Sequence, residues 1–199
     1  MSHPPKVSVV TVFYNRGPYV RASMDSLVSQ TLEDIEIIAV DDGSTDDTLN
    51  QLKRYESDPR VRVIAKQNSG FTNSMIQAVS ASRSAYVAVH DSGDISRRER
   101  LAKQAAILDA EMGVGVVSCW VAKQLRPDGP FDVHRPPSGA DFHALTLDEN
   151  PFTHGEVMFR RSVYDQVGGY RPVFTFAQDR DLWVRMSRHC DYRVVPETL

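Results

Sequence analysis

The 199-residue sequence has few cysteines and no excess of basic residues. Its two cysteines, Cys119 and Cys190, lie far apart, and their spacing is neither that of metal ligands nor that of a disulfide framework. The formal net charge of −3 argues against a nucleic-acid-binding protein, which normally carries a basic stripe. These absences predict a protein of a reducing compartment that has no nucleic-acid partner.

Long hydrophobic runs are also missing. No apolar run approaches the length of a transmembrane helix, and the N-terminus does not have the basic and then apolar layout of a signal peptide. With 41% hydrophobic and 25% charged residues, the composition is that of a globular domain with a sizeable core. We therefore expect a cytoplasmic protein, which would visit the inner face of the membrane if its substrate were lipid-linked.

Short apolar runs alternate with helical periodicity along the first 113 residues. Strands are predicted at 7–12, 35–40, 61–65 and 86–89, with amphipathic helices between them. Capping-box spacings from Ser44 to Asp47 and from Ser96 to Glu99 predict where two of these helices begin. Because strand and helix alternate at βαβ intervals, the expected fold class is α/β, a Rossmann-like single domain with a mostly parallel central sheet flanked by helices.

Polar and acidic residues follow these strands. The carboxyl ends of parallel strands lie at one edge of a sheet, so residues that follow them should meet in one crevice. The residues expected to converge are Asn15, Asp41, Asp42, Asn68, Asp91 and Asp94. A single acidic loop is more often a solvated connection, but the repetition of the pattern favours a binding site.

The predicted crevice lacks the usual phosphate-binding sequences. The first loop, FYNRGPY at 13–19, is neither a dinucleotide-binding G-x-G-x-x-G nor a P-loop. Carboxylates can accept hydrogen bonds from a nucleobase or from ribose, and they can hold a divalent cation against phosphates. A nucleotide–diphosphate–metal ligand would use all three abilities.

The sequence changes character after residue 113. A strand is predicted at 114–121, followed at 125–150 by a stretch rich in Pro, Gly and Asp that we interpret as a long excursion. Strand character returns at 154–159, and helices are predicted at 161–167 and 178–189. Asp179 and Asp181 lie in the first turn of the last helix, where acidic residues commonly complement the helix dipole.

Five segments of the chain, in order, resemble the inverting family 2 glycosyltransferases of bacterial surface-polysaccharide synthesis, which have the GT-A fold. The segments are VSVVTVFYN (7–15), SLVSQTLEDIEIIAVDDGSTDDT (26–48), VHDSGD (89–94), HGEVMFRRSVYDQVGGYR (154–171) and QDRDLWVRM (178–186). The resemblance implies transfer of a sugar, with inversion, from a nucleoside-diphosphate sugar to a hydroxyl of a glycan or lipid-linked acceptor. UDP is the favoured nucleotide.

The resemblance also implies roles for individual residues. The expected donor-binding residues are Thr11, Val12, Phe13 and Tyr14 of the first loop, Asp41 and Asp42, Asn68, and Asp91. Among these, Asp42 matches the carboxylate that meets the base, and Asp91 matches the first Asp of the family's D-x-D element. Asp179 is similar to the general base. His154 and Trp183 are expected on the acceptor side, although each is also compatible with a structural role.

The sequence departs from the family pattern at Gln178, where Glu is common, and in the D-x-D element. Gly93 stands where the second Asp of D-x-D is common, and Asp94 follows it. The expectation that Mg²⁺ or Mn²⁺ is bound is therefore weakened, and three alternatives stay open. Asp94 takes the place of the second Asp and holds the ion with Asp91, or Asp91 and water are sufficient ligands, or the activity depends only weakly on a metal.

The resemblance divides the domain into a nucleotide-sugar-binding half at 1–113 and an acceptor-binding and catalytic half at 114–199. Two alternatives stay open. The chain could be a catalytically weakened domain that only binds a nucleotide or a partner, or a sugar nucleotidyltransferase. The sequence does not predict the oligomeric state, and the chain ending at Leu199 is compatible with a minimal protein or with one domain of a longer one.

Overall fold

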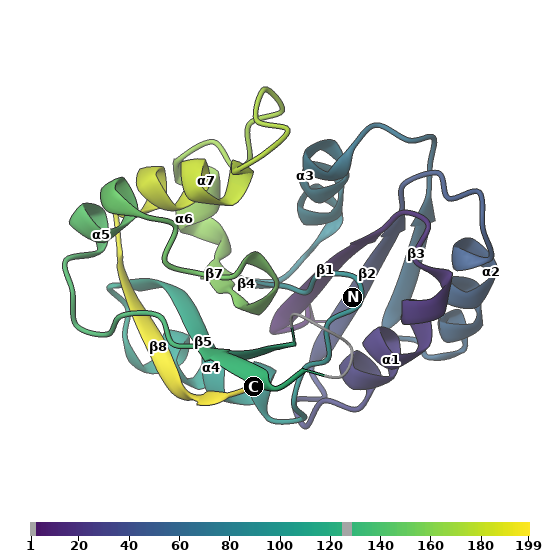
Figure 1. The fold of residues 1–199 in the computed structure, drawn as a ribbon, viewed down its shortest axis with the longest axis horizontal. Coiled ribbons are helices and arrows are strands. Elements are labelled where there is room, and N and C mark those ends of the chain that lie inside the picture. Colours follow the sequence, from purple (N-terminus) through teal and green to yellow (C-terminus); the bar gives the residue numbers. More distant parts are fainter. Residues whose placement is uncertain (1–2, 125–128) are drawn as a thin grey trace.

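The computed structural model describes residues 3–124 and 129–199 (Figure 1). These residues form an eight-stranded sheet in the order β3-β2-β1-β4-β7-β5-β6, with β8 paired to β5. The strands are β1 (Val7–Phe13), β2 (Ile35–Asp41), β3 (Val61–Ala65), β4 (Tyr86–Val89), β5 (Val114–Gln124), β6 (Phe131–His134), β7 (Met158–Arg160) and β8 (Asp191–Thr198). The helices are α1 (Gly17–Val28), α2 (Thr48–Lys53), α3 (Phe71–Ala81), α4 (Arg100–Ala110), α5 (Phe142–Asp148), α6 (Arg161–Gln166) and α7 (Gln178–Met186), with 3₁₀ turns η1 (Arg54–Ser57) and η2 (His154–Glu156).

The first half of the chain builds the parallel part of the sheet. β1 pairs in parallel with β2 and β4, and β2 pairs in parallel with β3. Every residue of β1 and β2 is buried, because helices cover both faces of this part of the sheet. Figure 1 shows α3 and α7 over one face and α1 and α4 over the other.

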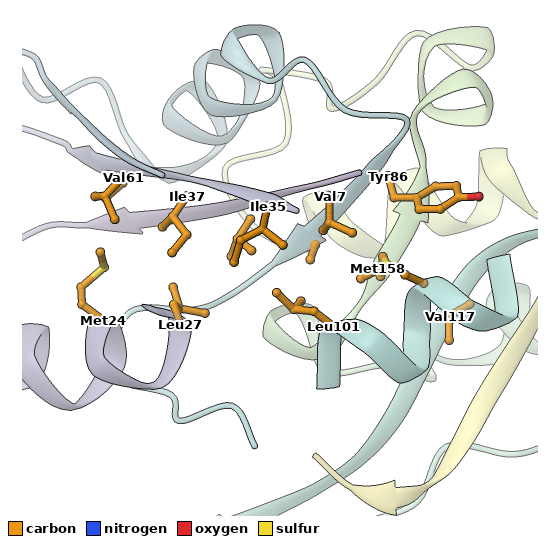
Figure 2. Close-up of a cluster of buried hydrophobic side chains, with 14 of the residues drawn as sticks. Val7, Met24, Leu27, Ile35, Ile37, Val61, Tyr86, Leu101, Val117 and Met158 are labelled. Carbon is orange, nitrogen blue, oxygen red and sulfur yellow. The ribbon is translucent and has the colours of Figure 1, made fainter. Parts of the chain in front are cut away.

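Alternate residues of β1 point to opposite faces of the sheet and belong to two different hydrophobic cores. Val7 and Val9 belong to the core that includes Met24 and Leu27 of α1 and Leu101 of α4, which Figure 2 shows from close by. Val10 and Val12 belong to the opposite core, with residues of α3 and α7. Burying side chains on both faces fixes the strand register, because a slip of one residue would exchange the two sets.

The second half of the chain extends the sheet with mixed pairings. β7 is antiparallel to β4 and β5, β6 is antiparallel to β5, and β8 is parallel to β5. Four of the seven pairings among the described residues are parallel. The predicted α/β class with a mostly parallel sheet is confirmed.

Two predicted helix caps are wrong. α2 begins at Thr48 and α4 begins at Arg100, and neither has a side-chain cap. The Ser44 hydroxyl instead accepts a hydrogen bond from the Asn15 amide (3.0 Å), and the Ser96 hydroxyl accepts one from the Arg100 guanidinium (2.9 Å). Both serines therefore brace loops rather than helix ends.

The second half also departs from the predicted element boundaries. Residues 154–156 form the turn η2 rather than a strand, because the Glu156 carboxylate accepts a hydrogen bond from the Thr153 amide (3.0 Å) and bends the chain there. Part of the predicted excursion at 125–150 is ordered as β6 and α5, while residues 125–128 lie outside the described residues. α7 ends at Met186, three residues before the predicted end.

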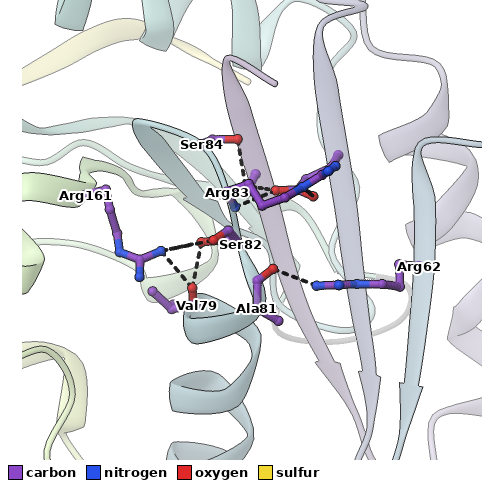
Figure 3. A network of polar contacts seen from close by, with 9 residues as sticks. Arg62, Val79, Ala81, Ser82, Arg83, Ser84 and Arg161 are labelled. Carbon is purple, nitrogen blue, oxygen red and sulfur yellow. Dashed lines mark hydrogen bonds and ion pairs between the residues drawn. The ribbon is translucent and has the colours of Figure 1, made fainter. Parts of the chain in front are cut away.

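Two arginines form hydrogen bonds with the end of α3, near the edge of the sheet where the parallel strands begin. Arg161 donates to the Val79 carbonyl (2.9 Å) and to the Ser82 hydroxyl (2.7 Å), and Arg62 donates to the Ala81 carbonyl (2.7 Å) (Figure 3). These bonds satisfy carbonyls at the end of α3 that have no partner within the helix. A cleft lies at the opposite edge, where the parallel strands end.

None of the helices formed by the described residues combines the length and the hydrophobicity needed to span a bilayer.

Candidate functional site

A cleft of about 580 Å³ lies where β1, β2 and β4 end. Residues spread over most of the sequence line this cleft, including Val12, Tyr14, Asp42, Asn68, Asp91 and His154. The structure thus brings together strand-end residues of the first half with η2 and the start of α7 from the second half. Gln178, the first residue of α7, also lines the cleft.

Asp42 forms one end of the cleft and is almost fully engaged. Its Oδ1 accepts hydrogen bonds from the Ser69 amide (2.9 Å) and from the Lys66 ammonium, and its Oδ2 accepts one from the Gly70 amide (3.0 Å). Burial alone would raise the pKa of Asp42, but the Lys66 ammonium and the Ser69 amide outweigh it, so the pKa is lowered. Asp42 is therefore ionised, and it ties residues 66–70 to the end of β2.

Three of the residues predicted to bind the donor lie behind the wall of the cleft. The side chains of Thr11 and Phe13 are fully buried, and Phe13 packs into the core beside α1. Asp41 is the last residue of β2 rather than part of a loop, and its Oδ2 accepts a hydrogen bond from the Ser44 amide (3.2 Å). Because side chains alternate along a strand, Val12 reaches the cleft while its neighbours Thr11 and Phe13 do not.

An acidic loop, defined here as residues 91–94, forms the other end of the cleft. The Asp94 amide donates to the Asp91 carbonyl (3.0 Å) and closes a tight turn, in which Gly93 has φ = 108°. Residues with a side chain rarely adopt this conformation, so the turn itself favours glycine at this position. A Cβ on Gly155 would lie 2.6 Å from Asp94 Oδ2 and 2.9 Å from the Asp91 nitrogen, so η2 packs closely against the loop.

The carboxylates of the acidic loop are poorly neutralised. Asp91 Oδ1 is buried without a hydrogen-bond partner among the described residues, and it lies 3.4 Å from His154 Nδ1. Burial would raise the pKa of Asp91, but the interaction with His154 lowers it. Burial and the repulsion of Asp91 raise the pKa of Asp94 to about 6. A divalent cation would relieve this repulsion, so these two carboxylates fit Mg²⁺ or Mn²⁺.

Such a cation would need further ligands from its substrate or from water. The described part of the chain contains no group of three or more His, Cys, Asp or Glu side chains able to hold a metal ion. Mg²⁺ is commonly bound by only one or two carboxylates together with substrate phosphates, so the pair Asp91 and Asp94 is compatible with that mode of binding.

Asp179 approaches the site from the second half of the chain. Its Oδ2 accepts a hydrogen bond from the Asn150 amide group (2.8 Å), and its side chain is nearly buried. Burial lowers the pKa of His154, but the interaction with Asp91, with a smaller contribution from the charge of Asp179, raises it overall. Ala177, directly before the helix, has the left-handed conformation with φ = 55°, and this turn sets where α7 begins.

Trp183 lies in the core rather than on the wall of the cleft. Its ring is fully buried and packs edge-on against Phe152 and Phe159, with centroids 6.2 Å apart in both pairs. The His154 ring, which does line the cleft, lies 6.5 Å from the indole. Trp183 thus supports His154 from behind.

A second cavity of about 480 Å³ lies on the other side of the acidic loop. Asp94, Gly155 and Glu156 line one side of it, and Val121 and Phe131 of the β5–β6 pair line the other. Burial raises the pKa of Glu156 to about 7, and its Oε2 has no hydrogen-bond partner among the described residues. The acidic loop therefore separates two cavities.

Sequence reasoning missed several residues that shape the site. Asn150 and Tyr170 carry no local pattern, because their partners lie 29 and 16 positions away in the sequence. Glu156 forms a capping box with Thr153, a T-x-x-E spacing that the sequence does contain, but its other partner, Ser118, lies 38 positions away. The segment that contains Glu156 and Tyr170, residues 154–171, could have drawn attention to them through the family resemblance.

Comparison with known proteins places this architecture among GT-A domains. The chain resembles the crystal structure of S. aureus TarS 1-349 in complex with UDP-GlcNAc (TM-score 0.80, 21% identity, 97% of this chain and 56% of that chain). It also resembles the mannosyltransferase PcManGT from Pyrobaculum calidifontis in complex with GDP-Man and Mn²⁺ (TM-score 0.75, 22% identity, 98% and 56%). At these identities the likeness establishes the fold.

The sequence comparisons identify the family. The family model described as glycosyl transferase family 2 matches residues 8–168, so the chain belongs to that family. The putative glycosyltransferase EpsE of Bacillus subtilis is 32% identical over 93% of this chain and 68% of its own length. The O-antigen biosynthesis glycosyltransferase WbnJ of Escherichia coli is 29% identical over 92% of this chain and 72% of its own length. The chain spans about two thirds of these relatives and little over half of the solved chains.

Proposed function

We propose that this chain transfers a sugar from a nucleoside-diphosphate sugar to a hydroxyl of a glycan or lipid-linked acceptor, with inversion, in polysaccharide biosynthesis. One observation carries the proposal: a single cleft joins the ionised Asp42, Asp91 of the acidic loop and Gln178 at the start of the helix that bears Asp179. The names of EpsE and WbnJ support the reaction class, and that of WbnJ supports the biosynthetic setting.

Residues 1–113 form the proposed nucleotide-sugar-binding half. A carboxylate offers about four acceptor sites, and Asp42 uses three of them on Lys66, Ser69 and Gly70. The remaining site can accept from an N–H of the nucleobase, with Tyr14 and Asn68 beside it on the cleft wall. The UDP-GlcNAc complex of TarS supports uridine as the first nucleoside to test.

The proposed diphosphate position is the acidic loop. Asp91 and Asp94 would hold Mg²⁺ or Mn²⁺, and the ion would neutralise charge on the departing diphosphate. The Mn²⁺ in the PcManGT complex supports testing manganese first. Asp91 also lies where it can accept from a ribose hydroxyl, because it lines the same cleft as Asp42.

Residues 114–199 form the proposed acceptor-binding and catalytic half. Asp179 takes the proton of the acceptor hydroxyl while that oxygen attacks the anomeric carbon and the bond to the diphosphate breaks. Such a single displacement inverts the configuration at that carbon. The carboxylate lies in the first turn of α7, at the positive end of the helix dipole, and the hydrogen bond from Asn150 orients it. His154 would line the acceptor side with Trp183 behind it.

The experiment is a donor assay with three arms. The protein is incubated with UDP-sugars and Mn²⁺, and released UDP is measured with and without candidate acceptors. Release of UDP that Asp179→Asn reduces supports the proposal. Pyrophosphate released from sugar 1-phosphate and UTP would instead favour a nucleotidyltransferase, and UDP binding with no turnover of any donor would favour a binding module. A cytoplasmic location at the inner membrane face stays a prediction from the sequence.

A further inference from the structure

A buried chain of polar contacts leads from the acidic loop into the second half of the protein. His154 Nδ1 lies 3.4 Å from Asp91 Oδ1, and on the other side of the ring His154 Nε2 lies 2.8 Å from the Tyr170 hydroxyl. His154 and Tyr170 are both buried, with 8% and 3% of their surface exposed. Solvent therefore cannot easily replace either contact.

The chemistry of the three groups determines which atom carries each proton. The 3.4 Å separation between His154 Nδ1 and Asp91 Oδ1 is an electrostatic contact rather than a formed hydrogen bond. Because an ionised carboxylate only accepts, this contact is favourable when the His154 nitrogen that faces Asp91 bears hydrogen. In the neutral ring this leaves the lone pair on Nε2, and the Tyr170 hydroxyl donates to it. The hydroxyl thus selects the tautomer of His154 and fixes the plane of the ring.

Tyr170 is itself held rigidly. Its backbone amide donates to the Tyr164 hydroxyl (3.2 Å), and its ring packs edge-on against Tyr164 (5.5 Å) and His154 (5.8 Å). Gly155, the residue after His154, also packs closely against the acidic loop, because a Cβ at Gly155 would lie only 2.9 Å from the Asp91 nitrogen. These contacts fix Tyr170 and the backbone next to His154.

We propose that Tyr170 is a positioning residue for the donor site, which acts through His154 to hold the Asp91 carboxylate where the diphosphate and its cation bind. The inference rests on the proposed function. It differs from the assignment of His154 to the acceptor side, because it makes His154 a link between the two halves. It also gives a role to Tyr170, which does not touch the proposed ligands.

The test removes only the hydroxyl. Tyr170→Phe keeps the aromatic packing, and we expect it to weaken UDP affinity in the presence of Mn²⁺ by about tenfold, as loss of a residue that orients a metal-binding group typically does. The matched control is Tyr192→Phe, because Tyr192 is equally buried and donates to the Pro137 carbonyl (2.7 Å) away from the cleft. Both variants should lose some thermal stability, but only Tyr170→Phe should lose affinity.

A double-mutant cycle tests the route through His154. His154→Asn retains a donor near Asp91 but is too short to reach Tyr170, so adding Tyr170→Phe to it should cause no further loss of affinity. Additive losses, equal losses in the Tyr192→Phe control, or unchanged affinity in Tyr170→Phe would each overturn the inference.

A ligand-free measurement separates this inference from the proposed function. Nitrogen-15 NMR of the histidine rings at alkaline pH should show His154 as the Nδ1–H tautomer in the wild type and a mixture of tautomers in Tyr170→Phe. If the wild type fails to bind UDP, the proposed function fails and the positioning role falls with it. If the wild type binds UDP while the tautomer and the affinity are the same in Tyr170→Phe, only the positioning role fails.

Discussion

The carboxylates at the two ends of the cleft have opposite environments. At the Asp42 end, an ammonium and two backbone amides surround the carboxylate, and its pKa is lowered. At the acidic-loop end, Asp91 has an oxygen with no hydrogen-bond partner among the described residues, and the pKa of Asp94 is raised to about 6. The protein itself supplies positive charge and donors to the carboxylate of the first end, whereas the carboxylates of the second end are only partly compensated by the protein.

We infer from this difference that the two ends of the cleft bind different parts of the ligand. A preorganised carboxylate recognises a fixed pattern of donors, such as a nucleobase edge, without rearranging. Asp91 and Asp94 repel each other, and a cation bound together with a diphosphate would reduce this repulsion. Changes at the Asp42 end should therefore alter affinity and stability together, whereas changes near the acidic loop and Asp179 should alter the response to metal or the rate of transfer.

The largest expected effect is on turnover. Asp179→Asn should reduce sugar transfer by at least about 100-fold, because a positioned general base typically contributes 10²–10⁴-fold. UDP affinity, measured by calorimetry, should stay within about twofold of wild type, since Asp179 lies outside the Asp42 end. Asp181→Asn is the control: Asp181 shares the first helical turn but pairs with Arg185 (2.6 Å), so it should affect stability rather than transfer. Full turnover in Asp179→Asn would remove it from the role.

The next largest effect is on UDP affinity and stability, and it concerns the Asp42 end of the cleft. Asp42→Ala should weaken UDP binding by about tenfold or more and lower the free energy of unfolding by about 3 kcal/mol, because the partly buried Lys66 ammonium and two backbone amides lose their acceptor. Asp42→Asn retains an acceptor oxygen and should lose less of both. Calorimetry and urea unfolding measure the two quantities. Affinity that does not change in Asp42→Ala contradicts the assignment of this end to the nucleoside.

A smaller effect tests how the acidic loop is held. Gly155→Ala would place a Cβ 2.6 Å from Asp94 Oδ2 and 2.9 Å from the Asp91 nitrogen, and such overpacking costs about 1–3 kcal/mol of stability. It should also reduce the gain in UDP affinity that Mn²⁺ provides. Gly113→Ala is the control, because nothing lies within 4 Å of its Cβ position. Equal stability of the two variants would show that η2 does not hold the loop.

The smallest effect concerns pH. The pKa of Glu156 is raised to about 7, so between its ordinary value and 7 the folded protein holds a proton that the unfolded chain has released. Stability therefore falls as pH rises through this window, by about 1 kcal/mol if solvent moderates the burial. Glu156→Gln keeps a neutral side chain and should flatten the decline, making the variant more stable than wild type at pH 8. Thermal unfolding from pH 5 to pH 8 measures this, and parallel pH profiles would contradict it.

The sequence was informative where local pattern and tertiary structure agree. The strands at 61–65 and 86–89 have the predicted boundaries, because their apolar runs are bounded by turn residues. The carboxylates at strand ends could be placed on one edge because parallel strands share it.

What could not be predicted depends on contacts between distant segments. The caps at Ser44 and Ser96 failed because Asn15 and Arg100 use those hydroxyls. The burial of Trp183 was left open, since an amphipathic helix gives an aromatic residue the same spacing on a core face or at the edge of a cleft. The partnership of Tyr170 with His154 spans 16 residues and leaves no periodic signal.

The central claim is that one cleft holds a nucleoside diphosphate between Asp42 and the acidic loop. Thermal unfolding with increasing UDP, with and without Mn²⁺, tests it most directly, because a ligand that binds only the folded state raises its stability. The account predicts a saturable rise in melting temperature that Mn²⁺ enlarges, that Asp42→Ala abolishes, and that Asp94→Asn reduces only in its Mn²⁺-dependent part. An unchanged melting temperature with UDP and with every other nucleoside diphosphate, in the presence and absence of Mn²⁺, would contradict it.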